Sequence, residues 1–249
     1  MMIEYESLAN SNSAYFSELE AAASRVIRSG WYVLGQEVSA FEQEFAAYCG
    51  ASHCVGMANG LDALVLTLRA WKEMGKLHEG DEVIVPAFTW IATANVVEHL
   101  GGTLVFCDID RNTFNIDVEL LKQKITPKTK AIVPVHLFGL AAEMKEINLL
   151  AKQHGLWVVE DAACGFGSHY HGQHVGTLGD AGCFSFHPRK AITTGEGGMI
   201  TTQDDALAEK LRRLRDHGGR ERRRHLDHRR RPVGVPPPLP PDRKSTRLN

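Results

Sequence analysis

Apolar strand-like runs and amphipathic helical patterns alternate along most of this chain, and this alternation limits the folds open to it. Strand-like runs occupy residues 53–57, 82–86, 103–107, 130–134, 156–160, 181–186 and 198–202, and helical patterns occupy residues 61–73, 90–100, 117–123 and 143–154. Strands that alternate with helices form βαβ units, whose strands pair in parallel and are covered by helices on both faces. The sequence therefore predicts a three-layer α/β fold around a mainly parallel sheet.

Two further amphipathic patterns precede the first strand-like run. Tyr15 to Arg28 and Phe41 to Tyr48 each predict a helix, with a loop over residues 30–35 between them. The composition, with 43% apolar and 23% charged residues, is typical of a globular protein that buries a core. No apolar run approaches the roughly twenty residues of a membrane span, and the first six residues are acidic where a secretory leader is basic. We therefore expect a cytoplasmic protein with no membrane partner and one large domain over residues 1–218.

The last part of the chain, residues 219–249, differs sharply from the rest. It carries ten Lys or Arg, three Asp or Glu and six of the ten prolines, so its charge is +7, whereas residues 1–218 carry −9. A nucleic-acid arm would explain the arginines, but the segment lacks apolar periodicity and its last eight residues back-translate to a common sequencing-adapter sequence. We expect a disordered or non-native tail from a frame-shifted gene model, without a nucleic-acid partner. Resequencing the gene tests this hypothesis, and a genuine tail would contradict it.

The cysteines and histidines do not form a recognisable metal site. The five cysteines are odd in number, scattered and mostly inside apolar runs, and they are Cys49, Cys54, Cys107, Cys164 and Cys183. This pattern favours small buried side chains over a disulfide framework or a CxxC site. His169, His171 and His174 surround Gly172, which favours a solvated hairpin over a metal site. We assign no metal.

Lys190 is the strongest candidate for a catalytic residue. It follows the strand-like run that ends at Phe186 and the helix-breaking Pro188, so its amine is expected at a strand end beside a cleft. An amine that is partly desolvated and close to other cations, here Arg189, loses its proton more readily and can form a Schiff base with an aldehyde. An ordinary solvated lysine is the alternative. The aldehyde that we expect is pyridoxal phosphate.

Two further strand ends supply matching partners for such a cofactor. Asp161 ends a buried-looking strand, where it could pair with a protonated pyridine nitrogen or simply cap the following turn. The strand-like run 53–57 leads through Asn59 into a helix that begins near Gly60 and Leu61. Because a helix N-terminus offers free N–H groups, this turn could bind the phosphate. The carboxyl ends of parallel strands meet at one edge of a sheet, so these groups are expected to lie together.

Several segments in order along the chain resemble the DegT/StrS family of sugar-nucleotide aminotransferases. They are Trp31–Gly35, Asn59–Leu64, Gly80–Pro86, Pro134–Gly139, Glu160–Ala163 and Ser185–Gly198. The resemblance runs from about Glu18 to Gly218, which makes it more specific than any single motif. It implies the aspartate-aminotransferase-like fold, which is fold type I of the pyridoxal-phosphate enzymes.

The resemblance also implies roles for individual residues. Trp90 would stack on the pyridine ring, although a half-buried tryptophan at a helix start is the alternative. Ser185 would donate its hydroxyl to the cofactor phosphate, unless it bonds to the backbone instead. Cys164 occupies a position where most relatives carry Gln or His, and its thiol is a weaker donor. Lys190 and Asp161 match the family's catalytic positions.

The resemblance implies that the protein moves an amino group to a nucleotide-linked keto sugar, and we expect glutamate to be the donor. This reaction would make amino sugars for a surface polysaccharide or a secondary metabolite. A homodimer is expected, in which a loop of the second chain completes the phosphate site. The family's small C-terminal domain is expected beyond Gly218 and is missing from this sequence.

Three alternatives stay open. A related dehydratase would carry histidine at the lysine position. A regulatory relative would bind cofactor or partner without turnover. A nicotinamide-dependent Rossmann enzyme would need a G-x-G-x-x-G turn, which Asn59–Asp62 does not provide.

Overall fold

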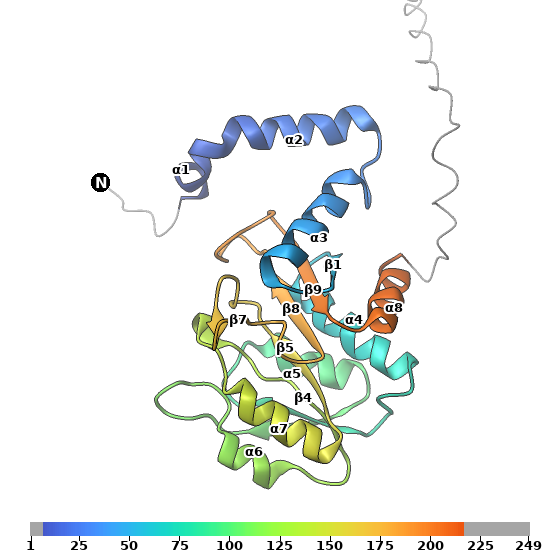
Figure 1. Cartoon of the computed structure of the whole chain (residues 1–249), viewed down its shortest axis with the longest axis vertical. Coiled ribbons are helices and arrows are strands. Elements are labelled where there is room, and N and C mark those ends of the chain that lie inside the picture. Colours follow the sequence, from blue (N-terminus) through green and yellow to red (C-terminus); the bar gives the residue numbers. More distant parts are fainter. Residues whose placement is uncertain (1–6, 217–249) are drawn as a thin grey trace, which may run out of the picture.

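A seven-stranded sheet forms the centre of the protein in a computed structural model that describes residues 7–216 (Figure 1). In spatial order its strands are β1 (His53–Met57), β9 (Gly198–Thr202), β8 (Ala181–Ser185), β5 (Trp157–Asp161), β4 (Thr129–Ile132), β2 (Glu82–Pro86) and β3 (Thr103–Cys107). Strand β9 is antiparallel to β1 and β8, and the other neighbouring pairs are parallel. The mainly parallel sheet predicted from the sequence is confirmed.

The helices agree with the predicted pattern in most positions. They are α1 (Leu8–Asn12), α2 (Phe16–Ser29), α3 (Gln36–Cys49), α4 (Gly60–Glu73), α5 (Ile91–His99), α6 (Val118–Lys124), α7 (Met144–His154) and α8 (Asp205–Arg215), with 3-10 turns η1 (Ser13–Tyr15) and η2 (Leu137–Gly139). Helix α3 begins earlier than predicted, directly after Gly35. Helix α8 was not predicted, and Asp204 caps it by accepting hydrogen bonds from the N–H groups of Ala206 and Leu207.

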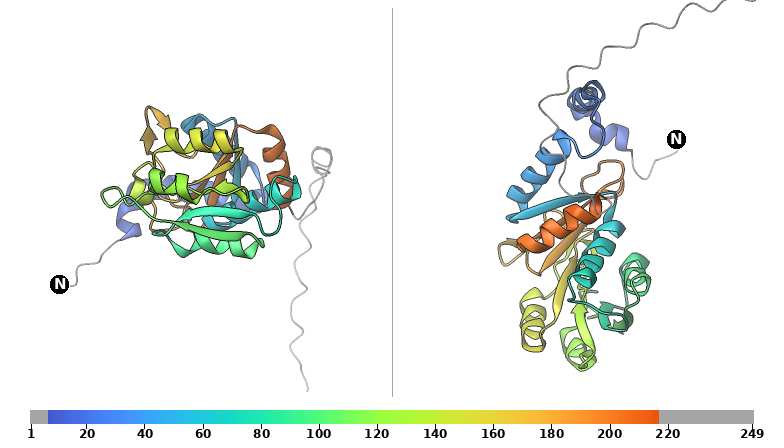
Figure 2. Two further views of the ribbon diagram at one scale, coloured as in Figure 1. Left: turned by 90° about the horizontal axis from the view of Figure 1, so that it is seen from below. Right: turned by 90° about the vertical axis from the view of Figure 1, so that its right-hand side faces the viewer.

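Helices cover both faces of the sheet, as the two views in Figure 2 show. Side chains alternate along each strand: Val83 and Val85 of β2 belong to an apolar cluster that includes residues of α4, α5 and α8, whereas Ile84 between them belongs to a second cluster with residues of α6 and α7. Beside β1, β8 and β9, α3 covers the second face. Strands buried on both sides explain the continuous apolar runs in the sequence. The three-layer architecture is therefore confirmed.

The N-terminal helix α2 lies apart from the sheet and its covering helices (Figure 1). None of its residues is buried, and a salt bridge from Arg25 Nε to Glu37 Oε1, 2.8 Å long, joins it to α3. The loop that follows exposes Tyr32 and Val33 to solvent. No helix within residues 7–216 is both long and apolar enough to cross a bilayer. The Arg/Pro-rich segment 219–249 and the predicted boundary at Gly218 lie outside the described residues.

Candidate functional site

The predicted site residues follow the carboxyl ends of four strands of the central sheet. Gly60 comes after β1, Trp90 after β2, Asp161 is the last residue of β5, and Lys190 comes after β8. These four strands run in the same direction, so their carboxyl ends lie along one edge of the sheet. Ligands of open α/β sheets bind at this edge.

The first turn of α4 lies directly against the end of β8. A Cβ atom added to Gly60 would lie 2.8 Å from Cβ of Ser185, and one added to Gly198 would lie 2.3 Å from the carbonyl oxygen of Asn59. Both positions therefore need glycine, because the backbones approach too closely for any side chain. Asn59 caps the helix by accepting a 2.7 Å hydrogen bond from the Asp62 N–H.

This contact places a hydroxyl group beside free backbone donors. The N–H groups of Gly60 and Leu61 are the first two of α4, so they have no acceptor within the helix. Ser185 is half-buried, and among residues 7–216 its hydroxyl accepts only a long 3.4 Å hydrogen bond, from the His187 N–H. The arrangement can bind an anion, because backbone N–H groups, a hydroxyl and the positive end of the helix dipole face the same space.

Asp161 is held in one orientation by two hydrogen bonds. Its Oδ2 accepts a 2.7 Å bond from the hydroxyl of Thr93, and its Oδ1 accepts a 3.2 Å bond from the Ala163 N–H. The residue is 6% exposed. Thr93 is buried in the first turn of α5 and also contacts the Thr89 hydroxyl at 3.0 Å. Thr93 was not identified from the sequence, because nothing in its local pattern shows that it reaches Asp161.

Lys190 and Cys164 are in direct contact. The Nζ atom of Lys190 lies 3.0 Å from Sγ of Cys164, and the Lys190 backbone N–H donates a 2.9 Å bond to the His187 carbonyl in a turn. Lys190 is half-buried, and Cys164 is exposed in the turn after β5. The sequence predicted that both residues belong to the site, and the structure brings their reactive atoms together.

Trp90 is the N-cap residue of α5, and its side chain is 78% exposed. The alternative of a half-buried tryptophan is therefore wrong. Its helix is joined to the site by the bond from Thr93 to Asp161, one turn further along. An exposed indole at this edge is available to a planar ligand, and its stacking on the cofactor stays a prediction.

A buried network that was not predicted lies next to Asp161. Glu160 and His136 are both completely buried, and His136 Nε2 lies 2.8 Å from Glu160 Oε2. Because His136 Nδ1 accepts the Ala142 N–H at 3.1 Å, the ring is protonated on Nε2 and donates to the carboxylate. Glu160 also accepts N–H bonds of 2.6–2.7 Å from Gly176, Leu178 and Gly179. One carboxylate thus joins β5 to the segment that leads into β8.

We expect Glu160→Gln to lower the free energy of unfolding by about 1–3 kcal/mol, because the amide nitrogen must face N–H donors and leaves at least one of them without an acceptor. Chemical denaturation of the parent chain and the variant measures this difference. Glu119→Gln, at an exposed position of α6, serves as the control and should change it by less than about 0.5 kcal/mol. Equal stability of the Glu160→Gln variant would contradict the proposed role of the network.

The histidine-rich hairpin is only partly as predicted. Strands β6 (His169–Tyr170) and β7 (Gln173–His174) form the expected antiparallel hairpin, but His174 is 3% exposed and not solvated. Its Nε2 accepts the Gly167 N–H at 3.0 Å, and its ring packs against Tyr48 and Phe184. Burial lowers the pKa of His174. The prediction of a solvated hairpin failed here because the turn folds back onto the aromatic core under α3.

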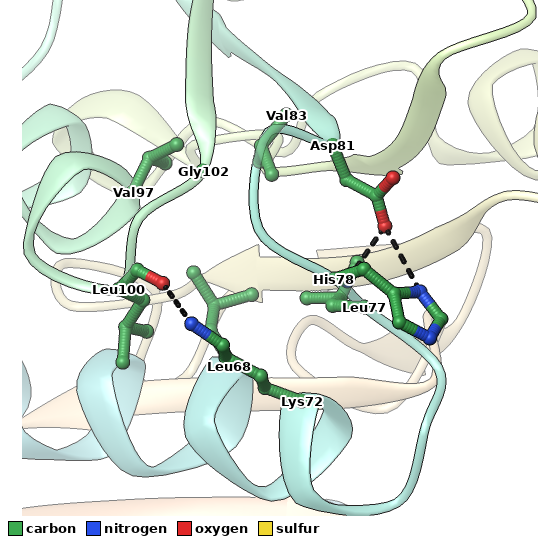
Figure 3. Close-up of a pocket in the computed structure, with 9 residues that line it drawn as sticks. All are labelled: Leu68, Lys72, Leu77, His78, Asp81, Val83, Val97, Leu100 and Gly102. Atoms are coloured by element: carbon green, nitrogen blue, oxygen red, sulfur yellow. Dashed lines mark hydrogen bonds and ion pairs between the residues drawn. The ribbon is translucent and has the colours of Figure 1, made fainter.

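A small apolar cavity lies elsewhere in the protein, between α4, α5 and the loop before β2 (Figure 3). Asp81 and Gly102 at its rim precede β2 and β3, so the cavity is at the amino ends of these strands. Lys72 closes one side by donating a 2.8 Å bond to the Leu100 carbonyl. This cavity is at the opposite edge of the sheet from Asp161 and is not part of the candidate site.

Residues 15–235 match the DegT/DnrJ/EryC1/StrS aminotransferase family, and the chain belongs to this family. The resemblance found in the sequence is thereby confirmed, and the alternative of a Rossmann oxidoreductase is excluded. The matched segment extends beyond the boundary that the sequence predicts at Gly218.

Among curated proteins, the chain is 48% identical over 226 residues to dTDP-3-amino-3,6-dideoxy-alpha-D-galactopyranose transaminase of Aneurinibacillus thermoaerophilus. The aligned region covers 90% of this chain and 61% of that protein. Among solved structures, DesV of S. venezuelae in complex with a ketimine intermediate is 42% identical, with a TM-score of 0.83 over 90% of this chain and 60% of that one. GDP-4-keto-6-deoxymannose-3-dehydratase with a trapped PLP-glutamate geminal diamine is 35% identical, with a TM-score of 0.77 over 80% of this chain and 52% of that one. The chain thus spans between half and two thirds of the length of these relatives.

Proposed function

We propose that the protein is a pyridoxal-phosphate-dependent aminotransferase that moves an amino group from glutamate to a nucleotide-linked keto sugar. The observation that carries this proposal is the position of Lys190, Asp161 and the first turn of α4 at one edge of the sheet in a chain of this family. The related proteins act on nucleotide sugars, and the dehydratase was trapped with PLP and glutamate. The activity belongs to amino-sugar biosynthesis.

The donors in the site fit each polar part of pyridoxal phosphate. The N–H groups of Gly60 and Leu61 and the hydroxyl of Ser185 would bind the phosphate, since the missing side chain of Gly60 lets the first turn of α4 approach Ser185 closely. The carboxylate of Asp161 would pair with the ring nitrogen. Trp90 would cover one face of the ring, and the Cys164 thiol would lie near its substituents. When bound, the cofactor supplies an electron sink for the reacting carbon.

Lys190 would perform two tasks. Its amine would hold the cofactor through the aldehyde carbon and, when free, would carry a proton at the reacting carbon of the substrate. The half-buried position and the flexible four-carbon stem suit this role, because the nitrogen can move while the backbone turn stays fixed.

Asp161 would keep the ring nitrogen protonated. The Thr93 hydroxyl and the Ala163 N–H both donate to its oxygens and hold the carboxyl group in one orientation. Thr93 acts as a positioning residue, because its hydroxyl donates a 2.7 Å hydrogen bond to Asp161. The lysine at position 190 favours the aminotransferase over the dehydratase, which by the resemblance would carry histidine there.

A single-turnover experiment tests this function. The purified full-length protein, loaded with pyridoxal phosphate and freed of excess cofactor, should convert glutamate to 2-oxoglutarate in an amount equal to the bound cofactor, because one half-reaction consumes one cofactor. Bound cofactor without any 2-oxoglutarate would contradict the aminotransferase and support a regulatory relative. A sample without cofactor serves as the control.

The assembly and location remain predictions. The exposed Tyr32, Val33 and Trp90 side chains would be covered in a homodimer whose second chain completes the phosphate site. Light scattering measures the oligomeric state, and a monomer with tightly bound cofactor would contradict the homodimer.

A cytoplasmic location fits the supply of nucleotide sugars, and fractionation of the native cells tests this location.

A further inference from the structure

Cys164 differs from every other cysteine of the chain in its exposure. The other four cysteines are buried. Burial raises the pKa of Cys49 to about 12 and that of Cys107 to about 11, and it also raises the pKa of Cys54 and Cys183. A thiol reacts with oxidants as its thiolate and only where an oxidant can reach it. Cys164 is therefore the single thiol in the chain that is open to a dissolved peroxide.

The environment of Cys164 also contains a nucleophile. Nζ of Lys190 lies 3.0 Å from its Sγ. The buried position of the remaining cysteines leaves no second thiol to form a disulfide with it. The lysine reaches the sulfur on a flexible stem, so a covalent bond between the two atoms needs only a small side-chain movement.

We propose that Cys164 is a peroxide-sensitive modification site that forms a reversible sulfenamide cross-link with Lys190 in protein without cofactor. In the first step the thiol takes one oxygen from hydrogen peroxide, which is reduced to water while the sulfur is oxidised to a sulfenic acid. In the second step the Lys190 amine attacks the sulfur. The S–N bond forms, the S–O bond breaks, and the hydroxyl leaves with the amine proton as a second water.

The cross-link has a direct consequence for the site. A nitrogen bound to sulfur has lost its nucleophilic character toward an aldehyde, so the oxidised chain cannot attach the cofactor through Lys190. Two equivalents of a small thiol reduce the S–N bond, release both side chains and leave as a disulfide. The loss of cofactor attachment rests on the proposed function of Lys190, whereas the cross-link depends only on the observed contact.

Mass spectrometry of the 249-residue chain tests the cross-link. Treatment of cofactor-free protein with hydrogen peroxide should lower the intact mass by two hydrogen atoms and join the peptides that contain residues 164 and 190. Dithiothreitol should restore the original mass. Cys164→Ser and Lys190→Arg should both lose the cross-link, and Lys190→Arg should instead gain oxygen at residue 164. Cys107→Ser, at a buried position on β3, is the matched control and should still form the cross-link.

Two results would overturn the proposal. One is a parent chain in which Cys164 only gains oxygen while Lys190 stays free, and the other is a cross-link that persists in Lys190→Arg. A second arm adds pyridoxal phosphate before the peroxide, at about a hundred times its dissociation constant, and should slow cross-linking at least about tenfold. Unchanged cross-linking in that arm would contradict the assigned role of Lys190 in cofactor attachment while leaving the cross-link itself established.

Discussion

Lys190→Ala should abolish covalent attachment of pyridoxal phosphate and the conversion of glutamate to 2-oxoglutarate. The variant removes the amine that follows β8, the strand paired with that of Asp161, and with it the group that would bind the aldehyde carbon and carry the proton. The expected change is complete loss and not a reduction, because a methyl group has no residual nucleophilicity. Borohydride reduction followed by mass spectrometry measures the attachment.

The fold should survive this substitution. Lys190 lies in a half-buried turn that is held by backbone bonds, so its side chain contributes little to the core. Unfolding of the variant by denaturant should match that of the parent chain within about 1 kcal/mol. Lys152→Ala, at an exposed position of α7, is the control and should keep full attachment. Cofactor that borohydride still fixes to the Lys190→Ala variant would show that another amine performs this task.

Much of the site could be predicted because parallel strands place their carboxyl ends along one edge of the sheet. Once Gly60, Asp161 and Lys190 are each placed after a strand, parallel pairing brings them to one edge whatever the loops do. The contact between Lys190 and Cys164 was not predictable in this way. It depends on the turn after β5 and the turn after β8 lying opposite each other, which follows from β5 and β8 being neighbours in the sheet.

The residues that sequence analysis missed act over long distances. Thr93 and Asp161 are 68 positions apart, and their contact depends on how α5 packs against the sheet beside β2 and β3. Glu160 directly precedes Asp161 in β5, yet successive residues of a strand point to opposite faces. That alternation was the available signal: it turns Glu160 toward His136 and the 176–179 segment, and Asp161 toward α5.

Asp161→Asn should leave cofactor binding measurable and slow glutamate conversion about a hundredfold or more, which corresponds to ~2.7 kcal/mol of barrier. The amide has almost the same shape and can still accept the Thr93 hydroxyl or the Ala163 N–H. It lacks the negative charge that holds a proton on the ring nitrogen, so the electron sink is weakened. Rapid-mixing measurement of 2-oxoglutarate formation under single-turnover conditions gives the rate.

Two comparisons separate this charge effect from the alternative that Asp161 only caps the turn to Ala163. Thr93→Val removes the hydroxyl but keeps the charge, so it should slow the reaction in the same direction by less, about tenfold. A cap would instead predict that Asp161→Asn lowers stability and leaves the rate within about threefold, less than the tenfold that ~1.4 kcal/mol of barrier provides. A slow variant of normal stability supports the pairing with the ring nitrogen, because an intact turn cannot account for a change confined to the reaction.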